Sequence, residues 1–294
     1  MTTTFRGLGT ALVTPFKTHG ALDDSAVERF VEFQIEGGVN FLVPCGTTGE
    51  NPALSVEEHR RVVEIVVKCA RGRVPVLAGA GSNSTDRAIE LAKIAIDLGA
   101  DGLLTITPYY NKPTADGLRR HFGLQAEAVE KMKHRFPMIM YNVPGRTGVN
   151  MTAATTVQIA NEIPNVIGVK EASGNMEQIL TILRDRPKNF LVLSGDDAWT
   201  LPLLAAGADG LVSVASNEVP TLMRRLIDER SIEIQNRLLP LLVGNFIESN
   251  PGPVKAALKM MKILENDTVR PPLAPITDAS RKKLESILRE CELL

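Results

Sequence analysis

The chain has 294 residues, of which 44% are hydrophobic and 23% charged, and its formal net charge is −1. This balance gives no electrostatic reason to expect a nucleic acid or an anionic membrane as a partner. No apolar run approaches the roughly 18 residues of a membrane span, and the start MTTTFR lacks the pattern of a secretion signal. Three widely spaced cysteines, Cys45, Cys69 and Cys291, are typical of free thiols in a reducing compartment. These features predict a cytoplasmic globular protein.

Short apolar runs alternate with longer amphipathic runs along most of the chain. The runs are rich in Val, Ile, Leu and Ala without strict alternation, as is typical of strands buried on both faces. We predict eight such strands, at residues 9–14, 41–45, 74–78, 102–107, 138–143, 166–170, 190–194 and 210–214.

Helical patterns lie between these runs. Residues 25–36, 55–70 and 85–98 repeat apolar side chains at helical spacing. Ser55 and Glu58 form a capping-box pattern at the start of the second helix, and Gly99 is well placed to end the third. The sequence therefore predicts a strand–helix unit of about 28 residues that recurs roughly eight times between residues 7 and 232.

Eight such units in right-handed succession favour a (β/α)8 TIM barrel. The competing fold is a doubly wound open sheet, which usually carries a glycine-rich phosphate loop after its first strand. Thr14, Pro15 and Phe16 stand there instead. We expect residues 1–231 to form the catalytic barrel and residues 232–294 a helical extension packed against it, with helices at 235–248, 254–265 and 278–291.

In barrels of this kind the active site lies at the carboxyl ends of the strands. The predicted strands two, four, five, six and seven are followed by polar segments that contain PCGTTGE (44–50), TPYYN (107–111), YNVPGRTG (141–148), VKEASG (169–174) and SGDD (194–197). All three tyrosines of the chain, Tyr109, Tyr110 and Tyr141, fall in two of these segments.

Lys170 follows the apolar residues Val-Ile-Gly-Val, so its side chain should emerge from a buried strand into the barrel mouth. Burial disfavours the ammonium form, and a neutral amine can attack a carbonyl group to form an imine. The alternative is a lysine that marks a solvated strand end and pairs with Glu171.

Tyr141 could move protons during imine formation, and Thr47 or Thr48 could extend that relay through a hydroxyl group. The alternatives are a rim aromatic with its hydroxyl group in water, and a tight Gly-Thr-Thr-Gly turn. Successive backbone amides in such a turn also suit a carboxylate.

Arg146 could hold a substrate carboxylate, or it could be a surface loop residue. Asp196 and Asp197 could act as metal ligands, as acid–base groups or as helix caps, and capping is the commonest role before a helix.

Metal chemistry has little support in the sequence, because all four histidines fall outside the predicted strand ends. They are His19, His59, His121 and His134. A zinc hydrolase barrel usually places its histidines on strands. Cys45 has no histidine on a neighbouring strand end, so we expect a buried thiol rather than a nucleophile.

Read together, the segments GLGTALVTPF (7–16), GTTGE (46–50), PYYN (108–111), YNVPGRTG (141–148) and GVKEASGN (168–175) resemble the pyruvate-dependent class I aldolase/lyase family. The likeness covers nearly the whole chain. It is greatest to the branch that condenses pyruvate with L-aspartate 4-semialdehyde in bacterial lysine (diaminopimelate) biosynthesis. The resemblance implies a lyase that needs no metal or organic cofactor and assembles as a homotetramer of two tight dimers.

The resemblance also implies roles for individual residues. Lys170 matches the lysine that forms a Schiff base with pyruvate. Tyr141 and Thr47 match a proton relay that includes Tyr110, whose counterpart reaches in from the neighbouring subunit.

The substrate-binding residues follow in the same way. Thr48 matches the residue that holds the pyruvate carboxylate, and Arg146 matches the arginine that receives the carboxylate of the semialdehyde. Gly195 and Val212 match positions whose backbone carbonyls line the pocket. A 2-keto-3-deoxy sugar acid aldolase of the same family is the alternative activity, and a non-catalytic binding barrel is a third possibility.

The sequence departs from the family pattern at several positions. Asn51 stands where serine is common. In lysine-inhibited members a glutamate and two histidines line the inhibitor site; here Arg87 and Val56 replace the glutamate and one histidine, and His59 matches the other. A cation there would repel the ammonium of lysine, so we expect weak feedback inhibition.

Overall fold

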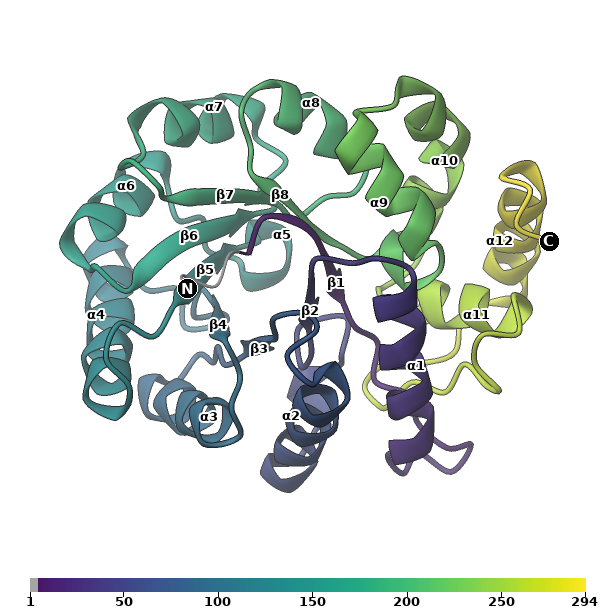
Figure 1. The fold of residues 1–294 in the computed structure, drawn as a ribbon, viewed down its shortest axis with the longest axis horizontal. Coiled ribbons are helices and arrows are strands. Elements are labelled where there is room, and N and C mark those ends of the chain that lie inside the picture. The colour runs from purple at the N-terminus through teal and green to yellow at the C-terminus, as the bar shows by residue number, and fades with distance from the viewer. Residues whose placement is uncertain (1–4) are drawn as a thin grey trace.

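Eight parallel strands form the centre of the computed structural model, which describes residues 5–294, and helices surround them (Figure 1). The strands are β1 (Gly7–Ala11), β2 (Phe41–Val43), β3 (Leu77–Gly79), β4 (Gly102–Ile106), β5 (Met138–Asn142), β6 (Val166–Glu171), β7 (Leu191–Ser194) and β8 (Gly210–Ser213). Their order in the sheet is β2-β1-β8-β7-β6-β5-β4-β3, and every neighbouring pair is parallel.

The two ends of this order meet, so that the sheet closes into a barrel. The Leu42 N–H donates to the Pro75 carbonyl and the Gly79 N–H to the Pro44 carbonyl, each at 2.9 Å. Leu42 also forms a parallel bridge with Val76. The predicted TIM barrel is confirmed, and the open sheet is excluded.

The helices of the barrel lie outside the strands. They are α1 (Asp24–Glu36), α2 (Val56–Ala70), α3 (Thr85–Asp97), α4 (Ala115–Met132), α6 (Ala153–Glu162), α7 (Met176–Asp185), α8 (Thr200–Ala205) and α9 (Pro220–Glu229). Three shorter elements, η1 (Asn51–Ala53), α5 (Pro144–Thr147) and η2 (Ala215–Asn217), follow strands at the barrel mouth. In the part of the chain that the structure describes, no helix has both the length and the apolar character that a membrane crossing requires.

The chain ends in α10 (Ile232–Gly244), α11 (Gly252–Met260) and α12 (Asp278–Glu290). Helix α10 packs against α9, α11 contacts η2, and α12 lies against α10 and α11 at the outer edge of the molecule (Figure 1). The prediction of helices packed against the barrel is confirmed. Helix α10 begins three residues earlier than predicted because the Ser231 side chain accepts a hydrogen bond from the Ile234 N–H and caps the helix there.

Two strands lie at other residues than predicted. The first lies at 7–11 instead of 9–14. The Leu12 N–H makes the last bond to β2, at 3.1 Å from the Val43 carbonyl, and the Val13 N–H donates to the Asn217 side chain instead. The third lies at 77–79 instead of 74–78, because Pro75 has no N–H to contribute to the ladder.

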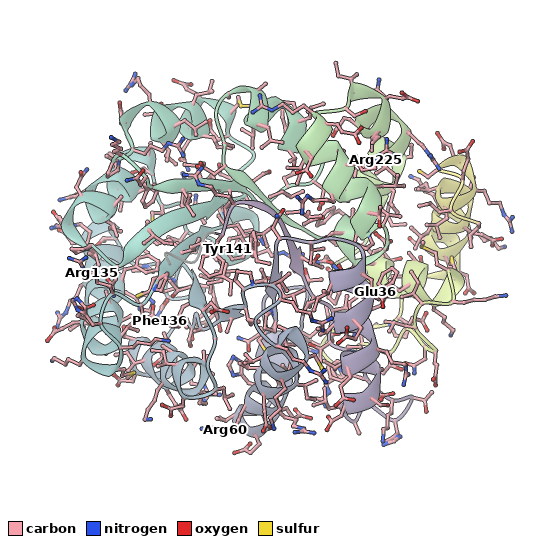
Figure 2. All side chains as sticks on the ribbon, in the orientation of Figure 1. Glu36, Arg60, Arg135, Phe136, Tyr141 and Arg225 are labelled. Atoms are coloured by element: carbon pink, nitrogen blue, oxygen red, sulfur yellow. The ribbon has the colours of Figure 1, made fainter. Side chains whose placement is uncertain are left out.

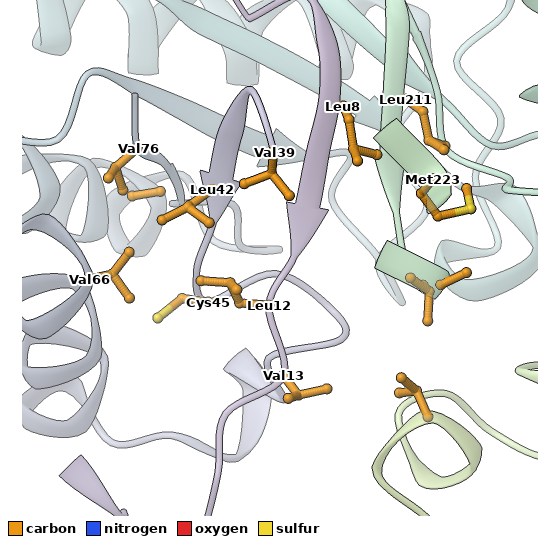
Figure 3. Close-up of a cluster of buried hydrophobic side chains, with 14 of the residues drawn as sticks. Leu8, Leu12, Val13, Val39, Leu42, Cys45, Val66, Val76, Leu211 and Met223 are labelled. Atoms are coloured by element: carbon orange, nitrogen blue, oxygen red, sulfur yellow. The ribbon is translucent and has the colours of Figure 1, made fainter. Parts of the chain in front are cut away.

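Two apolar layers hold the barrel together. Side chains from alternate positions of the strands fill its interior, where Phe5 and Phe41 meet edge to face with ring centroids 5.6 Å apart. A larger cluster, which includes Leu8, Leu42 and Val66, joins the strands to the surrounding helices (Figure 3). Gly9 leaves the space that the Phe41 ring occupies, since a Cβ there would lie 2.1 Å from the ring.

Candidate active site

Tyr141 and Lys170 lie side by side at the carboxyl ends of β5 and β6. They are register partners in the sheet, and the Lys170 Nζ lies 4.2 Å from the centroid of the Tyr141 ring. Tyr141 lies in the middle of the barrel, whereas Arg60, Arg135 and Arg225 lie at the periphery (Figure 2). The structure thus joins the two residues that the sequence singled out.

The Lys170 amine is almost completely buried, with 6% of the residue exposed. Burial lowers its pKa to about 7; the nearby charge of Arg146 lowers it further, and that of Asp197 opposes the shift. A large fraction of the side chain is therefore a neutral amine near neutral pH, which is the form that attacks a carbonyl carbon.

The Tyr141 phenol is also buried, and burial raises its pKa above the ordinary value. The positive charge of Arg146 and a hydrogen bond with the Thr47 hydroxyl group lower this pKa and so partly offset the effect of burial. At neutral pH this phenol is protonated, so it can donate a proton to an oxygen bound in front of Lys170.

A cavity of about 150 Å³ opens in front of these groups. Six of the eight predicted site residues line it: Thr47, Thr48, Tyr141, Arg146, Lys170 and Gly195. Arg146 lies on the short helix α5, exposed at the rim, where the sequence suggested only a loop. Among residues 5–294 no carboxylate forms an ion pair with it, so its guanidinium is free to bind an anion.

The loop after β2 presents Thr47 and Thr48 to the same cavity. It turns tightly, with the Glu50 N–H donating to the Thr47 carbonyl at 3.0 Å. Within the described residues, the backbone N–H groups of Thr47 and Thr48 find no acceptor in the protein. Two free amides beside a hydroxyl group are suited to a carboxylate.

The sequence did not indicate that the C-terminal extension contributes to this cavity. Phe246 and Asn250 line it, and the Asn250 Nδ2 donates to the Thr48 Oγ1 at 3.0 Å. This bond uses the Thr48 oxygen as an acceptor, so the Thr48 hydroxyl hydrogen stays free to point to a ligand. The pattern Asn-Pro before a predicted helix was the only sequence signal, and it reads equally well as a turn.

The same loop is anchored by a buried ion pair. The carboxylate of Glu50, whose backbone is left-handed at φ 55°, accepts hydrogen bonds from Lys255 of α11 and, at 2.8 Å, from the Arg270 N–H. The Lys255 Nζ also donates to the Thr268 carbonyl at 2.8 Å. Burial lowers the pKa of Lys255 to about 8, while Glu50 opposes the shift. The extension therefore fixes the position of the Thr47–Thr48 loop.

Replacing Lys255 with methionine should strongly destabilise the protein, because it leaves the Glu50 carboxylate buried without its cation. We expect the free energy of unfolding to fall by about 3–5 kcal/mol, measured by urea denaturation. The matched control is Lys259→Met on the same helix, because Lys259 forms a half-exposed pair with Asp267. A similar, small loss in both variants would contradict the role of the buried pair.

Glu171 is not the partner of Lys170. Its buried carboxylate accepts hydrogen bonds from the Ser173 N–H at 2.7 Å and from the side-chain amides of Asn142 and Gln178. Successive strand residues face opposite sides of a sheet, so Glu171 lies on the helix side while Lys170 faces the mouth. The alternative of a Lys170–Glu171 pair is wrong.

The two aspartates after β7 have different roles. Asp196 accepts hydrogen bonds from the Ala198 and Trp199 N–H groups in the turn before α8, and it also lines the cavity. Helix α8 itself begins at Thr200 without a side-chain cap, so the predicted helix-capping role is wrong. Asp197 is buried and accepts hydrogen bonds from the Ser213 hydroxyl and the Val214 N–H. Burial raises the pKa of Asp197 to about 6.

Gly195 and Val212, whose backbone carbonyls were predicted to line the pocket, follow β7 and lie in β8, respectively. Gly195 lines the cavity, whereas the side chain of Val212 belongs to the interior apolar layer beneath. A Cβ on Gly195 would lie 2.7 Å from the Ala172 Cβ and 3.0 Å from the Lys170 Cε. The absence of a side chain at Gly195 therefore makes room for the lysine.

Gly195→Ala should displace the Lys170 amine and slow imine formation by about 5-fold to 150-fold, because overpacking by one methyl group costs about 1–3 kcal/mol. The measurement is the rate at which borohydride traps a pyruvate adduct. Gly145→Ala is the control, because a Cβ at Gly145 would meet no atom within 4 Å. Equal trapping rates in both variants would contradict the steric argument.

The remaining tyrosines lie away from Lys170 within this chain. Tyr110 is 89% exposed and has a left-handed backbone at φ 71°, so the structure does not bring it to Tyr141 and Thr47. Tyr109 lines a second cavity, which it shares with Thr47 and Tyr141. The role of Tyr110 in a proton relay therefore stays a prediction.

The residues that bear on feedback inhibition lie near this second cavity. His59 is buried, its Nε2 lies 2.8 Å from the Gly79 carbonyl, and burial lowers its pKa. The charge of Arg87, which pairs with Glu90 at 2.7 Å, lowers that pKa further. Cys45 is buried as expected, and burial raises the pKa of its thiol, which leaves it a poor nucleophile.

The chain matches the sequence model of the Dihydrodipicolinate synthetase family over residues 4–291. It belongs to this family. The 4-hydroxy-tetrahydrodipicolinate synthase of Koribacter versatilis is 49% identical to it, with 98% of this chain and 97% of the relative covered. The enzyme of the same name from Thermotoga neapolitana is 45% identical, with 99% and 100% covered.

Solved structures of dihydrodipicolinate synthases have the same fold. The structure from Thermotoga maritima aligns with a TM-score of 0.94 at 42% identity, covering 99% of each chain. A chloride-inhibited synthase from Acinetobacter baumannii, complexed with pyruvate, aligns with a TM-score of 0.94 at 41% identity and covers 99% of this chain and 100% of its own. A variant described as the first monomeric dihydrodipicolinate synthase aligns with a TM-score of 0.93 at 42% identity and covers 99% of this chain and 98% of its own.

Proposed function

We propose that this protein condenses pyruvate with L-aspartate 4-semialdehyde to give 4-hydroxy-tetrahydrodipicolinate, in lysine biosynthesis through diaminopimelate. The observation that carries the proposal is the buried Lys170 amine, with a pKa of about 7, in a cavity that also holds Tyr141 and Arg146. The relatives reported above are synthases of this name, which favours this reaction over cleavage of a 2-keto-3-deoxy sugar acid.

Lys170 begins the reaction by adding its neutral amine to C2 of pyruvate. Loss of water from the resulting carbinolamine gives an imine, and protonation of the imine nitrogen makes C2 an electron sink. A proton then leaves C3, which gives an enamine whose C3 attacks the aldehyde carbon of the semialdehyde. Finally the amino group of that substrate attacks C2, closes the ring and releases Lys170 as a free amine.

Proton transfers in these steps fall to Tyr141 and Thr47. The Tyr141 phenol stands beside the Lys170 amine and donates a proton to the oxygen that leaves as water. Thr47 adjoins Tyr141 and lines both cavities, so it can pass that proton toward solvent. Tyr110 completes the relay in this proposal, from a neighbouring subunit of a homotetramer.

Binding of the two carboxylates fixes the order of the substrates. The Thr47 and Thr48 amides and the Thr48 hydroxyl group face the cavity near Lys170 and hold the pyruvate carboxylate. Arg146 stands at the rim and receives the carboxylate of the semialdehyde, which enters second. The backbone carbonyls of Gly195 and Val212 accept hydrogen bonds at the base of the cavity. A condensation assay that compares aspartate semialdehyde with sugar-derived aldehydes tests the choice of substrate.

We propose that the protein works in the cytoplasm. Cys45, Cys69 and Cys291 are free thiols, and none of the steps above calls for an oxidising environment.

We expect lysine to inhibit this protein weakly. Arg87 places a positive charge near His59, and the ammonium group of lysine would be repelled there. Lysine at sub-millimolar concentration should leave the steady-state rate of condensation unchanged. Inhibition in that range would contradict the expectation, and Arg87→Glu is the variant in which we expect sensitivity to increase.

A further inference from the structure

A buried carboxyl group, Glu218, lies behind the active site between η2 and α9. It is 2% exposed, and its Oε2 accepts a hydrogen bond from the Asn245 Nδ2 at 2.7 Å. No Lys, Arg or His among residues 5–294 forms an ion pair with it. Burying a carboxylate without a cation is costly, so its protonation state needs an explanation.

Two oxygens of this pair have no partner. They are the Glu218 Oε1 and the Asn245 Oδ1, and both are buried. Each belongs to a group whose other polar atom is already in the Glu218–Asn245 hydrogen bond. A carboxylic acid and an amide face to face form two hydrogen bonds, because the acid O–H donates to the amide oxygen while the amide N–H donates back. A proton on Oε1 would make that oxygen a donor, and the Asn245 Oδ1 is the buried acceptor that lacks one.

Asp197 has the opposite surroundings. Its two carboxylate oxygens accept hydrogen bonds from the Ser213 hydroxyl and from the Val214 N–H, the latter at 2.9 Å. Donors alone surround it, which suits the ionised form, whereas Glu218 faces one donor and one acceptor.

We propose that Asn245 holds Glu218 as a neutral carboxylic acid, so that Asp197 alone carries the negative charge behind Lys170. The link to Lys170 rests on the proposed function, but the protonation state of Glu218 does not. Glu218 is in this view a positioning residue: it keeps its proton and so leaves the charge on Asp197 to act on the lysine.

The electrostatic surroundings agree with this assignment. Burial raises the pKa of Glu218 well above its ordinary value, and the charge of Asp197 raises it further. The other titratable groups near it are the Cys291 thiol at the end of α12, whose pKa a charge on Glu218 would raise, and Glu36 of α1, which is exposed beside the same surface hollow. Arg237 of α10 is the cation near Cys291, but it donates to the Cys291 carbonyl and pairs with Glu292 rather than with Glu218.

Glu218→Gln tests the protonation state through stability. A carboxyl group with a raised pKa stabilises the folded state fully only below its ordinary pKa near 4.5, and this stability is lost as the pH rises toward the folded-state pKa. A glutamine pairs with Asn245 at every pH. The melting temperature of Glu218→Gln relative to the parent should therefore rise by about 2–4 °C for each pH unit above the ordinary pKa near 4.5, until the folded-state pKa is reached. A difference that is constant over this range overturns the proposal.

Glu171→Gln is the matched control for that measurement. Glu171 is equally buried and burial raises its pKa too, but all its hydrogen-bond partners are donors, so an amide at this position must place its NH2 group against one of them. We expect the melting temperature of this variant to lie below that of the parent at neutral pH, whereas that of Glu218→Gln should lie above it. Infrared spectra give a second readout, since the carbonyl band of a protonated carboxyl group should disappear in Glu218→Gln at neutral pH. If the parent has no such band, the proposal is wrong.

Asn245→Asp tests the link to Lys170. It sets a second carboxyl group against Glu218, so that one proton is shared and one negative charge is added near Asp197. The added charge favours the ammonium form of Lys170 and should move the pH midpoint of pyruvate trapping upward by at least about half a unit. Glu218→Gln should not move it. An unshifted midpoint in Asn245→Asp overturns the link to the lysine, whereas failure of the parent to trap pyruvate contradicts the proposed function and leaves the stability result standing.

Discussion

Borohydride reduction in the presence of pyruvate should modify Lys170 and abolish activity. The neutral amine is the reacting form, so the trapping rate should fall about tenfold per pH unit below pH 7 and level off above it. Lys170→Met removes the amine that forms the imine in the proposed reaction, so condensation should fall by at least about 10³-fold. Peptide mass mapping locates the adduct, and a steady-state assay measures the rate.

Lys255 is an internal control for this experiment. It is also buried and its pKa is also lowered, to about 8, but its amine is bound to Glu50 and does not line the cavity. A low pKa alone would make both lysines reactive, whereas the proposed site makes only one of them reactive. An adduct on Lys255, or an adduct that survives in Lys170→Met, would contradict the assignment.

Arg146→Ala should separate the two substrates. The variant retains Lys170 and the Thr47–Thr48 loop, so pyruvate should still be trapped. The kcat/KM for the semialdehyde should fall by about 30-fold or more, because the carboxylate of this second substrate loses the cation that binds it. Arg146 also lowers the pKa of Lys170, so its removal should move the pH midpoint of trapping upward.

The control for this variant is Arg225→Ala, which removes an exposed arginine of α9 at the periphery (Figure 2). It should change neither the kinetics nor the pH midpoint. Equal loss of pyruvate trapping and condensation in Arg146→Ala would show that Arg146 supports the fold of the site instead. A faster reaction with sugar-derived aldehydes than with aspartate semialdehyde would favour the sugar acid aldolase.

Most of the barrel could be predicted because its strands are continuous apolar runs separated by capped helices. The same regularity located Lys170 and Tyr141, because residues at the carboxyl ends of adjacent parallel strands must lie together. The ends of the strands were harder to place. Hydrophobicity continues through Leu12 and Val13 after the ladder has ended, since these side chains enter the core that joins barrel and helices.

The contribution of the C-terminal extension could not be predicted from periodicity. Asn250 and Lys255 act over about 200 residues of sequence, through contacts with Thr48 and Glu50 that only the packing of α11 creates. Lys255 stands in an apolar helical pattern where a lysine is usually a solvated residue. The Glu218–Asn245 pair was missed for the same reason, because two polar residues 27 positions apart carry no joint signal.

The ion pair between Glu50 and Lys255 has a consequence for the order in which the protein becomes functional during synthesis. The ribosome delivers Glu50 long before Lys255, and the last barrel strand ends at Ser213, so a nascent chain can possess every strand while its Thr47–Thr48 loop has no anchor. The chain must extend through α11 to Arg270, whose N–H also binds Glu50, before Thr47 and Thr48 are held in place. The contacts that hold the Thr47–Thr48 loop are therefore completed only by residues from the last sixth of the sequence.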